Sequence, residues 1–560
     1  MKLHTAVLKH ACVLGALAGW AGPLAAGAPD AGQTLQQFRP SPPPPAPAAG
    51  LTGQPPAPQE AKPAPPPSGF EERVQLREVV FQGHTRFDAA TLEHLVADAL
   101  GRSLSFRELD ELTDRITRFY RSAGYPFAQA RLPAQEIVEG RLRIEVVEGR
   151  LGAIQAVDVS GASLPEARAF LESLQPGAVI EGRALERVLQ LIDEQPGYRS
   201  SAVMRPGSSP GLGDLLLVLE KTPSPTLELG LDNHGNRYTG RQRLRLDFVA
   251  DSPFRFGDRL ALTGLTSRPQ QSGNITFGDL SYQWPLDNDG LRAQFRYASS
   301  GYRLGQEFAA LDQSGSAKAI EIGLSHALLR AHDHQTTLTW RLIRKTLGDH
   351  TAATGEDSAT RSWSLPANVR AEFRDAFGGG GLTLLDMTWT WGRMRNRGSA
   401  AQAPSSPTAF SKLEATVART QRLTGPFSAH VQLTAQTSRR DLDSSEGFDI
   451  SGPQAVRAYP SGDAYGDEGW FTRAELRWSP VDRWTAFLFH DQGTSNSRHD
   501  PTTDHPRRRI AGHGIGLRFG GDSQSLEAVL AWPTRRLATT DPQESVSGPR
   551  IWVRLHHRFD

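Results

Sequence analysis

The sequence lacks long hydrophobic runs and has almost no cysteine. Apolar residues make up 38% of its 560 residues, and no long apolar run follows the N-terminal segment. Membrane-spanning helices are therefore excluded from the rest of the chain, because each needs about 20 predominantly apolar residues. The single cysteine is Cys12, so the chain beyond it has neither disulfides nor thiol chemistry.

An excess of charge of one sign and catalytic motifs are also missing. The chain has 62 basic and 61 acidic residues, a net charge of +1, whereas a nucleic-acid-binding protein is typically strongly basic. It contains no Gly-rich phosphate loop with Lys, no His-Glu-x-x-His and no nucleophile elbow. We therefore expect no enzyme activity, no catalytic residues, no metal or other cofactor, and no nucleic-acid partner.

The N-terminal residues divide into three segments. Residues 1–26 are expected to form a signal peptide, with Lys2 and Lys9 before a short apolar core and small residues around Ala26. A membrane anchor is the alternative, but the apolar stretch is too short to span a bilayer. Residues 27–39 are expected to contain a turn or two of helix. Residues 40–68 are rich in Pro and are expected to form an extended linker.

Two small modules of the same pattern follow the linker. Residues 74–149 predict a strand over Val74–Phe81, a helix over Ala89–Leu100, a second helix that Ser105 caps, and two further strands. Residues 150–222 repeat this β-α-α-β-β order. The sequence therefore predicts two tandem α+β domains.

From Thr226 to the end of the chain the pattern changes to strict alternation. The segment 385–391 is typical, since Leu385, Met387, Trp389 and Trp391 alternate with Asp386, Thr388 and Thr390. A period of two with one apolar face indicates strands that are half buried in apolar surroundings. A soluble repeat fold such as a propeller is the alternative, but no blade-like repeat is visible.

The connections between these strands alternate in length. Short turns are predicted at 251–257, 285–290, 374–380, 422–426, 479–483 and 520–524, and long loops at 346–360, 394–407, 439–467 and 494–508. Short turns on one rim and long loops on the other are typical of bacterial outer-membrane barrels, which have an even number of strands. Residues 226–560 therefore predict a membrane β-barrel of about sixteen antiparallel strands.

The longest loop contains the run Val456-Arg457-Ala458-Tyr459-Pro460, followed by Gly462, Gly466 and Gly469. This composition favours a compact loop of defined conformation. With the two modules and the barrel, the chain resembles the transporters of two-partner secretion, the TpsB or haemolysin-activator-like group of the ShlB/FhaC/HecB type. The two modules resemble POTRA domains, and the loop resembles the family's sixth loop, which has a Val-Arg-Gly-Tyr or Val-Arg-Gly-Phe core. Residues 27–39 are then a candidate plug helix.

The resemblance implies a lock inside the barrel. In the family the sixth loop folds into the lumen and its Arg pairs with an Asp of a Phe-x-Asp-x-Gly strand, which corresponds here to Arg457 and Asp491. In a water-filled lumen such a pair contributes about 1 kcal/mol, a scale that suits a reversible gate. Ala458 stands where the family more often has Gly. The candidate lock residues are Val456, Arg457, Ala458, Tyr459, Pro460 and Asp491, with Gly462, Gly466, Asp467, Gly469, Phe489 and Gly493 in support.

The final strand, over 550–560, alternates and places the aromatic residue Phe559 one position before the end. In outer-membrane barrels such a residue is the usual signal for insertion, so the resemblance implies that the barrel assembly machinery and periplasmic chaperones handle the chain during biogenesis.

The resemblance further implies a function and a location. The barrel is expected in the outer membrane of a Gram-negative bacterium, in contact with outer-membrane lipid, with the POTRA-like domains in the periplasm. These domains would capture an unfolded TpsA-like exoprotein by β-augmentation, and the barrel would secrete it once the loop moves. One alternative is an assembly factor of the same superfamily that inserts other barrels. A passive porin is the alternative from a different class.

Overall fold

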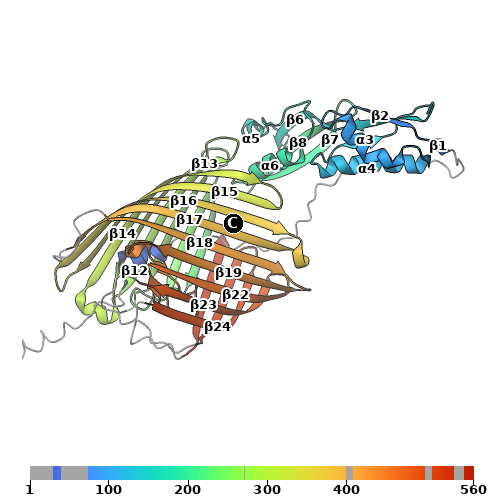
Figure 1. Ribbon diagram of the computed structural model, residues 1–560. Helices are drawn as coiled ribbons and strands as arrows, with labels where there is room; N and C mark the ends of the chain where they lie inside the picture. The colour runs from blue at the N-terminus through green and yellow to red at the C-terminus, as the bar shows by residue number, and fades with distance from the viewer. Residues whose placement is uncertain are drawn as a thin grey trace, which may run out of the picture.

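A closed barrel forms most of the molecule. The computed structural model describes residues 29–38, 73–269, 271–398, 408–497, 507–534 and 548–559, so the expected signal peptide and linker lie outside the described residues. Sixteen antiparallel strands form the barrel (Figure 1). It closes where β26 pairs with β9. The strands are β9 (Thr226–Asp232), β10 (Arg243–Asp251), β11 (Arg259–Ser267), β12 (Asn274–Pro285), β13 (Leu291–Arg303), β14 (Gln313–Arg330), β15 (His334–Thr351), β16 (Glu356–Asp375), β17 (Gly381–Gly398), β18 (Thr408–Arg422), β19 (Phe427–Ser438), β22 (Glu468–Val481), β23 (Trp484–Asn496), β24 (Arg507–Gly520), β25 (Gln524–Pro533) and β26 (Arg550–Phe559).

The alternation in sequence becomes an apolar outer wall and a polar inner wall. On β19, Val431 and Leu433 are 52% and 43% exposed, while His430, Thr434 and Gln436 are buried. Because successive side chains of a strand point to opposite faces, the exposed apolar set lies on the outside of the barrel. The predicted fold class, a membrane β-barrel of sixteen strands after α+β domains, is confirmed.

The strands differ greatly in length. Strands β9 to β11 have 7 to 9 residues, whereas β14 to β17 have 18 to 20. Two of the expected long loops are therefore wrong in part. The segment 346–360 continues β15 and β16 up to a turn at residues 352–355, and β17 runs on to Gly398. These strands exceed the roughly 9–11 residues that cross a bilayer and project beyond it.

The two α+β domains precede the barrel. The first contains β1 (Arg73–Gln75), β2 (Glu78–Gln82), α3 (Ala89–Val96), η1 (Ala97–Ala99), β3 (Ser103–Ser105), α4 (Phe106–Ser122), β4 (Gln129–Arg131) and β5 (Arg141–Val147). The second contains β6 (Arg150–Asp158), α5 (Pro165–Phe170), α6 (Gly182–Asp193), β7 (Tyr198–Pro206) and β8 (Leu212–Lys221). Each has a three-stranded sheet, in the orders β2-β5-β4 and β6-β8-β7.

The strand expected over Val74–Phe81 is instead two strands. β1 pairs with β3, while β2 pairs with β5 in the central sheet. Between them the amide of Leu76 donates to the carbonyl of Arg102, and the Leu76 side chain is fully buried in the core of the domain. The expected cap is present at α4, where Ser105 and Glu108 form a reciprocal capping box.

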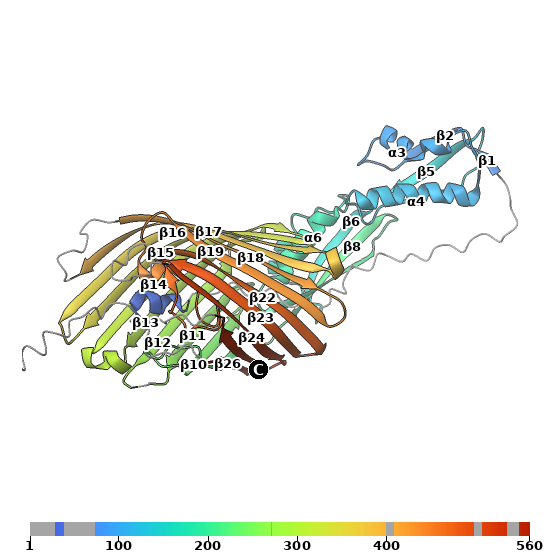
Figure 2. The same cartoon turned by 60° about the horizontal axis from the view of Figure 1, so that its bottom comes forward.

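The second domain is fixed to one end of the barrel (Figures 1 and 2). From α6, Arg187 binds Asp289 at 3.0 Å and the carbonyl of Ala327 at 3.0 Å. Arg330 binds Glu194 at 2.6 Å. The partners on the barrel lie in or next to the short turns, which therefore face the domains; we call this rim the domain end and the opposite rim the far end.

A short helix lies inside the barrel. α2 (Ala31–Gln36) is capped by Asp30, which accepts from the amide of Gln33 at 2.8 Å. Ala31 and Leu35 pack with Phe277 and Tyr302 of the barrel wall and with Tyr238 of the connection between β9 and β10. A helix therefore does form within residues 27–39, and it contacts the lumen side of the barrel. None of the helices in the described ranges has the length and apolar character to cross a membrane.

Candidate functional site

The loop between β19 and β22, residues 439–467, folds into the barrel. It contains η4 (Ser444–Glu446), β20 (Phe448–Asp449) and β21 (Tyr465–Gly466). Val456 and Tyr459 are fully buried, and Arg457 is 1% exposed. This loop therefore places the expected Val-Arg-Ala-Tyr core in the lumen, and we call it loop 6.

Internal hydrogen bonds give loop 6 a defined shape. The carboxylate of Asp449 accepts from the amide of Ser451 at 2.9 Å and from the amide of Gly462 at 2.8 Å. The hydroxyl of Ser451 in turn accepts from the amide of Asp463 at 2.9 Å. Gly462 has a φ of 85°, a conformation that favours glycine. These bonds hold the buried tip as one unit.

Arg457 binds Asp491 on the inner wall through three hydrogen bonds. Its Nη2 lies 2.7 Å from Oδ1, its Nε lies 2.8 Å from Oδ2, and its backbone amide donates to Oδ2 at 3.2 Å. The side chain of Asp491 is fully buried. The pair is not screened by lumen water, contrary to the expectation from sequence, so the figure of about 1 kcal/mol for an exposed pair does not apply.

A second carboxylate, Glu475 of β22, completes the site. Its Oε1 lies 2.7 Å from Nη1 of Arg457, and it also accepts from both Arg518 and Arg477 at 2.8 to 3.1 Å. Sequence reasoning missed this residue. The available signal was the alternation of β22, which sends Arg473, Glu475 and Arg477 to the inner wall together.

Aromatic side chains enclose the guanidinium. The Phe489 ring centroid lies 3.6 Å from Cζ of Arg457, and Phe487 lies two residues away on the same face of β23. The indole of Trp552 donates to the Arg457 carbonyl at 2.7 Å. Cation–π contact and exclusion of water both strengthen the ion pairs.

Ala458 fits the loop because its partner is a glycine. Ala458 is not among the residues with positive φ, so a β-carbon is tolerated there. The space comes from β24, since a β-carbon on Gly512 would lie 2.4 Å from that of Ala458. The methyl group of Ala458, at the position where the resemblance implies Gly, therefore fits because Gly512 has no side chain.

The other expected supporting residues lie near the base of the loop. A β-carbon on Gly466, Gly469 or Gly493 would lie 2.5 to 2.7 Å from a backbone oxygen of the neighbouring strand. Asp467 accepts from the amide of Leu442 at 2.9 Å. Pro460 is buried beside Tyr459. Phe559 is distant from the lock; it pairs with Leu227 at the closing seam of the barrel and is 44% exposed.

Two lysines of the wall hold the first part of loop 6. Glu446 lies 2.6 Å from Nζ of Lys345 and 3.0 Å from Nζ of Lys412, and all three side chains are at most 7% exposed. The neighbouring carbonyl of Gly447 accepts from the amide side chain of Gln36 on α2 at 2.9 Å. The Lys345–Glu446–Lys412 clamp therefore connects the wall, the loop and the helix.

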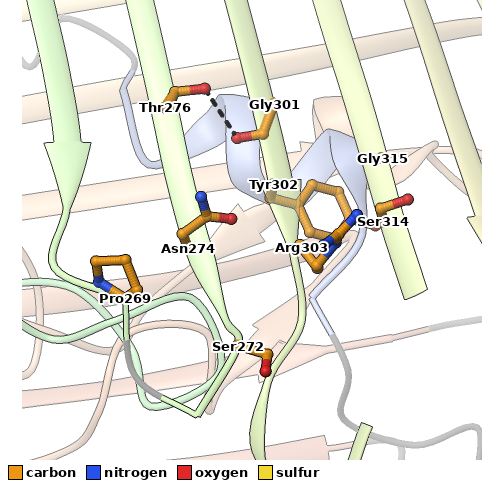
Figure 3. Close-up of a pocket in the computed structure, with 9 residues that line it drawn as sticks. All are labelled: Pro269, Ser272, Asn274, Thr276, Gly301, Tyr302, Arg303, Ser314 and Gly315. Carbon is orange, nitrogen blue, oxygen red and sulfur yellow. Dashed lines mark hydrogen bonds between the residues drawn. The ribbon is translucent and has the colours of Figure 1, made fainter. Parts of the chain in front are cut away.

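A polar hollow of about 390 Å³ lies at the far end of β12 to β14 (Figure 3). Within it the hydroxyl of Thr276 donates to the carbonyl of Gly301 at 3.4 Å. Its lining contains none of the lock residues, so it is not part of the candidate site. In the described part of the chain, no group of three or more His, Cys, Asp or Glu side chains could hold a metal ion.

Two family models match the chain. The model of the haemolysin secretion/activation protein ShlB/FhaC/HecB matches residues 211–519, and that of the ShlB-type POTRA domain matches residues 74–149. Among individual proteins, the heme/hemopexin transporter protein HuxB of Haemophilus influenzae is 24% identical over 415 residues, 72% of each chain. The outer membrane transporter CdiB of Dickeya dadantii is 24% identical over 495 residues, 85% of this chain and 86% of that protein.

The fold is shared with a solved structure. CdiB from Escherichia coli aligns with a TM-score of 0.70 at 21% identity, covering 89% of this chain and 93% of that one. The family model spans more than half of the present sequence, and the barrel and α+β domains agree with it. The chain belongs to the ShlB/FhaC/HecB haemolysin secretion/activation family, the TpsB transporters of two-partner secretion, which lie in the outer membrane with their POTRA domains in the periplasm.

Proposed function

We propose that this protein captures an unfolded TpsA-like exoprotein in the periplasm and secretes it through its barrel, with loop 6 as the gate. The observation that carries the proposal is the buried contact of Arg457 with Asp491 and Glu475. It attaches a self-contained loop to the inner wall by a few charge-assisted hydrogen bonds, which are strong but break without covalent change.

The POTRA domains offer sheet edges to an extended chain. In the second domain β7 is at the edge of the sheet, pairs with β8 along nine residues, and is largely exposed, with Val203 43% exposed. A free strand edge can bind an extended segment through backbone hydrogen bonds. We assign cargo capture to such edges and no catalytic role to any residue.

If loop 6 leaves the lumen, the two carboxylates of the wall that bind Arg457 still have other arginines near them. When Arg457 departs, Glu475 keeps its contacts with Arg518 and Arg477. Asp491 lies opposite Arg473 in the register of β22 and β23. The cost of opening is therefore lower than the cost of leaving two isolated buried carboxylates, which favours a reversible gate over a permanent plug.

The remaining partners follow from the barrel itself. The apolar outer wall meets outer-membrane lipid, and Phe559 on β26 would be read by the barrel assembly machinery after delivery by periplasmic chaperones. The assembly machinery and the chaperones act during biogenesis, the lipid surrounds the mature barrel, and only the exoprotein is cargo.

Co-expression with a large exoprotein encoded by a neighbouring gene tests the proposal. We expect the exoprotein outside the cell with the natural protein and a loss of most secretion with Arg457→Ala. Arg440→Ala, at an exposed position of the same loop, is the matched control and should secrete normally.

Two results would contradict it. If the exoprotein stays inside the cell while other barrel proteins disappear from the outer membrane of the deletion strain, the protein is an assembly factor. If it stays inside and ion conductance is the same with and without the lock, the protein is a passive porin.

A further inference from the structure

The outer wall of the barrel carries a cluster of unpaired basic side chains on β14 to β17. These long strands lie side by side and reach past the others at the extracellular end, remote from the POTRA domains (Figures 1 and 2). The cluster consists of Lys318, Arg344, Arg361, Arg393 and Arg395, all exposed. We call it the basic band.

The strand register places these side chains in two adjacent rows. In the inner row Arg344 is opposite Trp363, and Trp363 is opposite Arg393. In the outer row Lys318 is opposite Thr346, Thr346 is opposite Arg361, and Arg361 is opposite Arg395. Because directly opposite residues of antiparallel strands lie about 5 Å apart, the five cations share one small area.

An apolar girdle lies directly beneath the band, on the membrane side. Leu365 is opposite Trp391, one step below the inner row, and these side chains are 55% and 45% exposed. Trp389 and Trp340, further down, are 53% and 48% exposed. Aromatic residues of outer-membrane barrels mark the membrane interface, so the band stands at the level of the outer-leaflet headgroups.

The band is not neutralised by protein carboxylates. Many barrel arginines elsewhere form ion pairs, as in Arg296 with Asp279 at 2.5 Å and Arg419 with Asp375 at 2.8 Å. In the described residues none of the five cations forms an ion pair. Asp357, nearer the tip of β16, contacts His350 at 2.8 Å instead.

Arg344 shows how the band is held. Its Cζ lies 5.5 Å from the ring centroid of Trp363, which itself is 51% exposed to the membrane side. This contact keeps a guanidinium at the boundary between the apolar girdle and water. Like charges gathered at such a boundary repel one another unless an anion lies among them, and arginine forks match phosphate geometry.

We propose that the basic band binds the phosphate groups of a phosphorylated glycolipid of the outer leaflet and so anchors the projecting strands to the membrane surface. The occupant is a lipid and not a soluble anion, because the cations stand immediately above a membrane-facing girdle. This role is separate from cargo secretion and from the lock.

The test uses the full-length protein in detergent, titrated with bisphosphorylated lipid A and followed by native mass spectrometry. We expect the double variant Arg361→Gln/Arg393→Gln to lose about tenfold or more in affinity, since each cation near an anionic surface contributes roughly 1 kcal/mol. The matched control is Arg268→Gln/Arg509→Gln, two exposed positions at the same end of the barrel, on or next to strands remote from β14 to β17, which should change affinity less than twofold.

Three further binding measurements test the same proposal. Affinity of the natural protein should fall as salt rises, which needs no variant to fold. Lipid A without phosphates should bind much more weakly, and Arg361→Lys/Arg393→Lys, which keeps the charges but not the guanidinium forks, should bind more tightly than the Gln double variant and more weakly than the natural protein. The proposal is overturned if the Gln double variant binds like the natural protein, if dephosphorylated lipid A binds equally well, or if sodium phosphate alone binds as tightly as the lipid.

Discussion

Glu475 touches Arg457 with one carboxylate oxygen, at 2.7 Å, while both of its oxygens contact Arg518. The same residue thus contacts both loop 6 and the barrel wall. Asp491, by comparison, is held by three hydrogen bonds that all come from Arg457 of loop 6.

This difference predicts distinct effects of two isosteric changes. Asp491→Asn should free the loop and raise single-pore conductance, with little effect on the barrel. Glu475→Gln should raise conductance and also lower the melting temperature, because Arg518, Arg477 and Arg457 lose a shared counter-charge; removing one partner of a buried pair costs about 3–5 kcal/mol. Planar-bilayer recordings measure the conductance. The temperature at which the barrel loses its folded mobility on a denaturing gel measures the melting temperature. Equal melting temperatures for the two variants would show that Glu475 has no role in the wall.

The contact between Ala458 and Gly512 predicts a compensating pair. Gly512→Ala would place two β-carbons 2.4 Å apart and should push the loop tip from the wall, increasing conductance. Adding Ala458→Gly removes one of these atoms and should restore much of the closed state. Conductance of the four members of this cycle gives the coupling. Additive effects would mean that the two residues do not touch in the closed gate.

The Lys345–Glu446–Lys412 clamp predicts that the loop base and α2 move together. Glu446→Gln leaves two buried ammonium groups without their carboxylate and should cost about 3 kcal/mol or more. Thr34 on α2 is 1% exposed, so Thr34→Cys should react slowly with a maleimide in an otherwise natural chain and much faster when Glu446→Gln is added. Unchanged reactivity would show that the helix is held without the clamp.

The first POTRA domain should loosen in acid. Burial alone would raise the pKa of Glu148, but hydrogen bonds from Thr85, Arg86 and Tyr120 outweigh it and hold the pKa below its ordinary value of 4.5. A lowered pKa means that the carboxylate stabilises the fold above pH 4.5, and that this stability is lost as pH falls through the folded-state pKa.

Hydrogen exchange of the Thr85 amide measures this loss. Protection should be high at neutral pH and fall steeply in the acidic range below pH 4.5, whereas Glu148→Gln should show reduced protection at neutral pH and a flatter profile. Since hydrogen bonds to a charged group contribute about 1.5–3 kcal/mol, we expect a loss of that order at neutral pH in the variant. The same pH profile in both proteins would assign the acid response to another group.

Much of the fold could be predicted because the barrel repeats one local rule. Alternation places Val431 outside and His430 inside without any knowledge of distant residues. The projecting parts of β15 and β16 could not be predicted in this way. Beyond the membrane they lose the apolar outer face, so the segment 346–360 resembles a polar loop although most of its residues remain paired in β15 and β16.

The candidate site could likewise be predicted only in part. Arg457 and Asp491 were predicted from motifs in each segment, and the structure places them in contact. Glu475, Gly512 and Trp552 carry no motif of their own. They reach the lock only through strand register and barrel closure, which join residues far apart in sequence. The burial of the ion pair likewise depends on Phe487 and Phe489 around it.

Helix α2 and the first POTRA domain are connected through residues 39–72 of the same chain. In the proposed transport cycle, a helix displaced from the lumen would stay tethered, and its return would be an intramolecular event governed by an effective concentration. Closure after each such cycle would then need no second molecule and would not depend on how many copies the membrane holds. The transporter would then restore the permeability barrier of the membrane by itself.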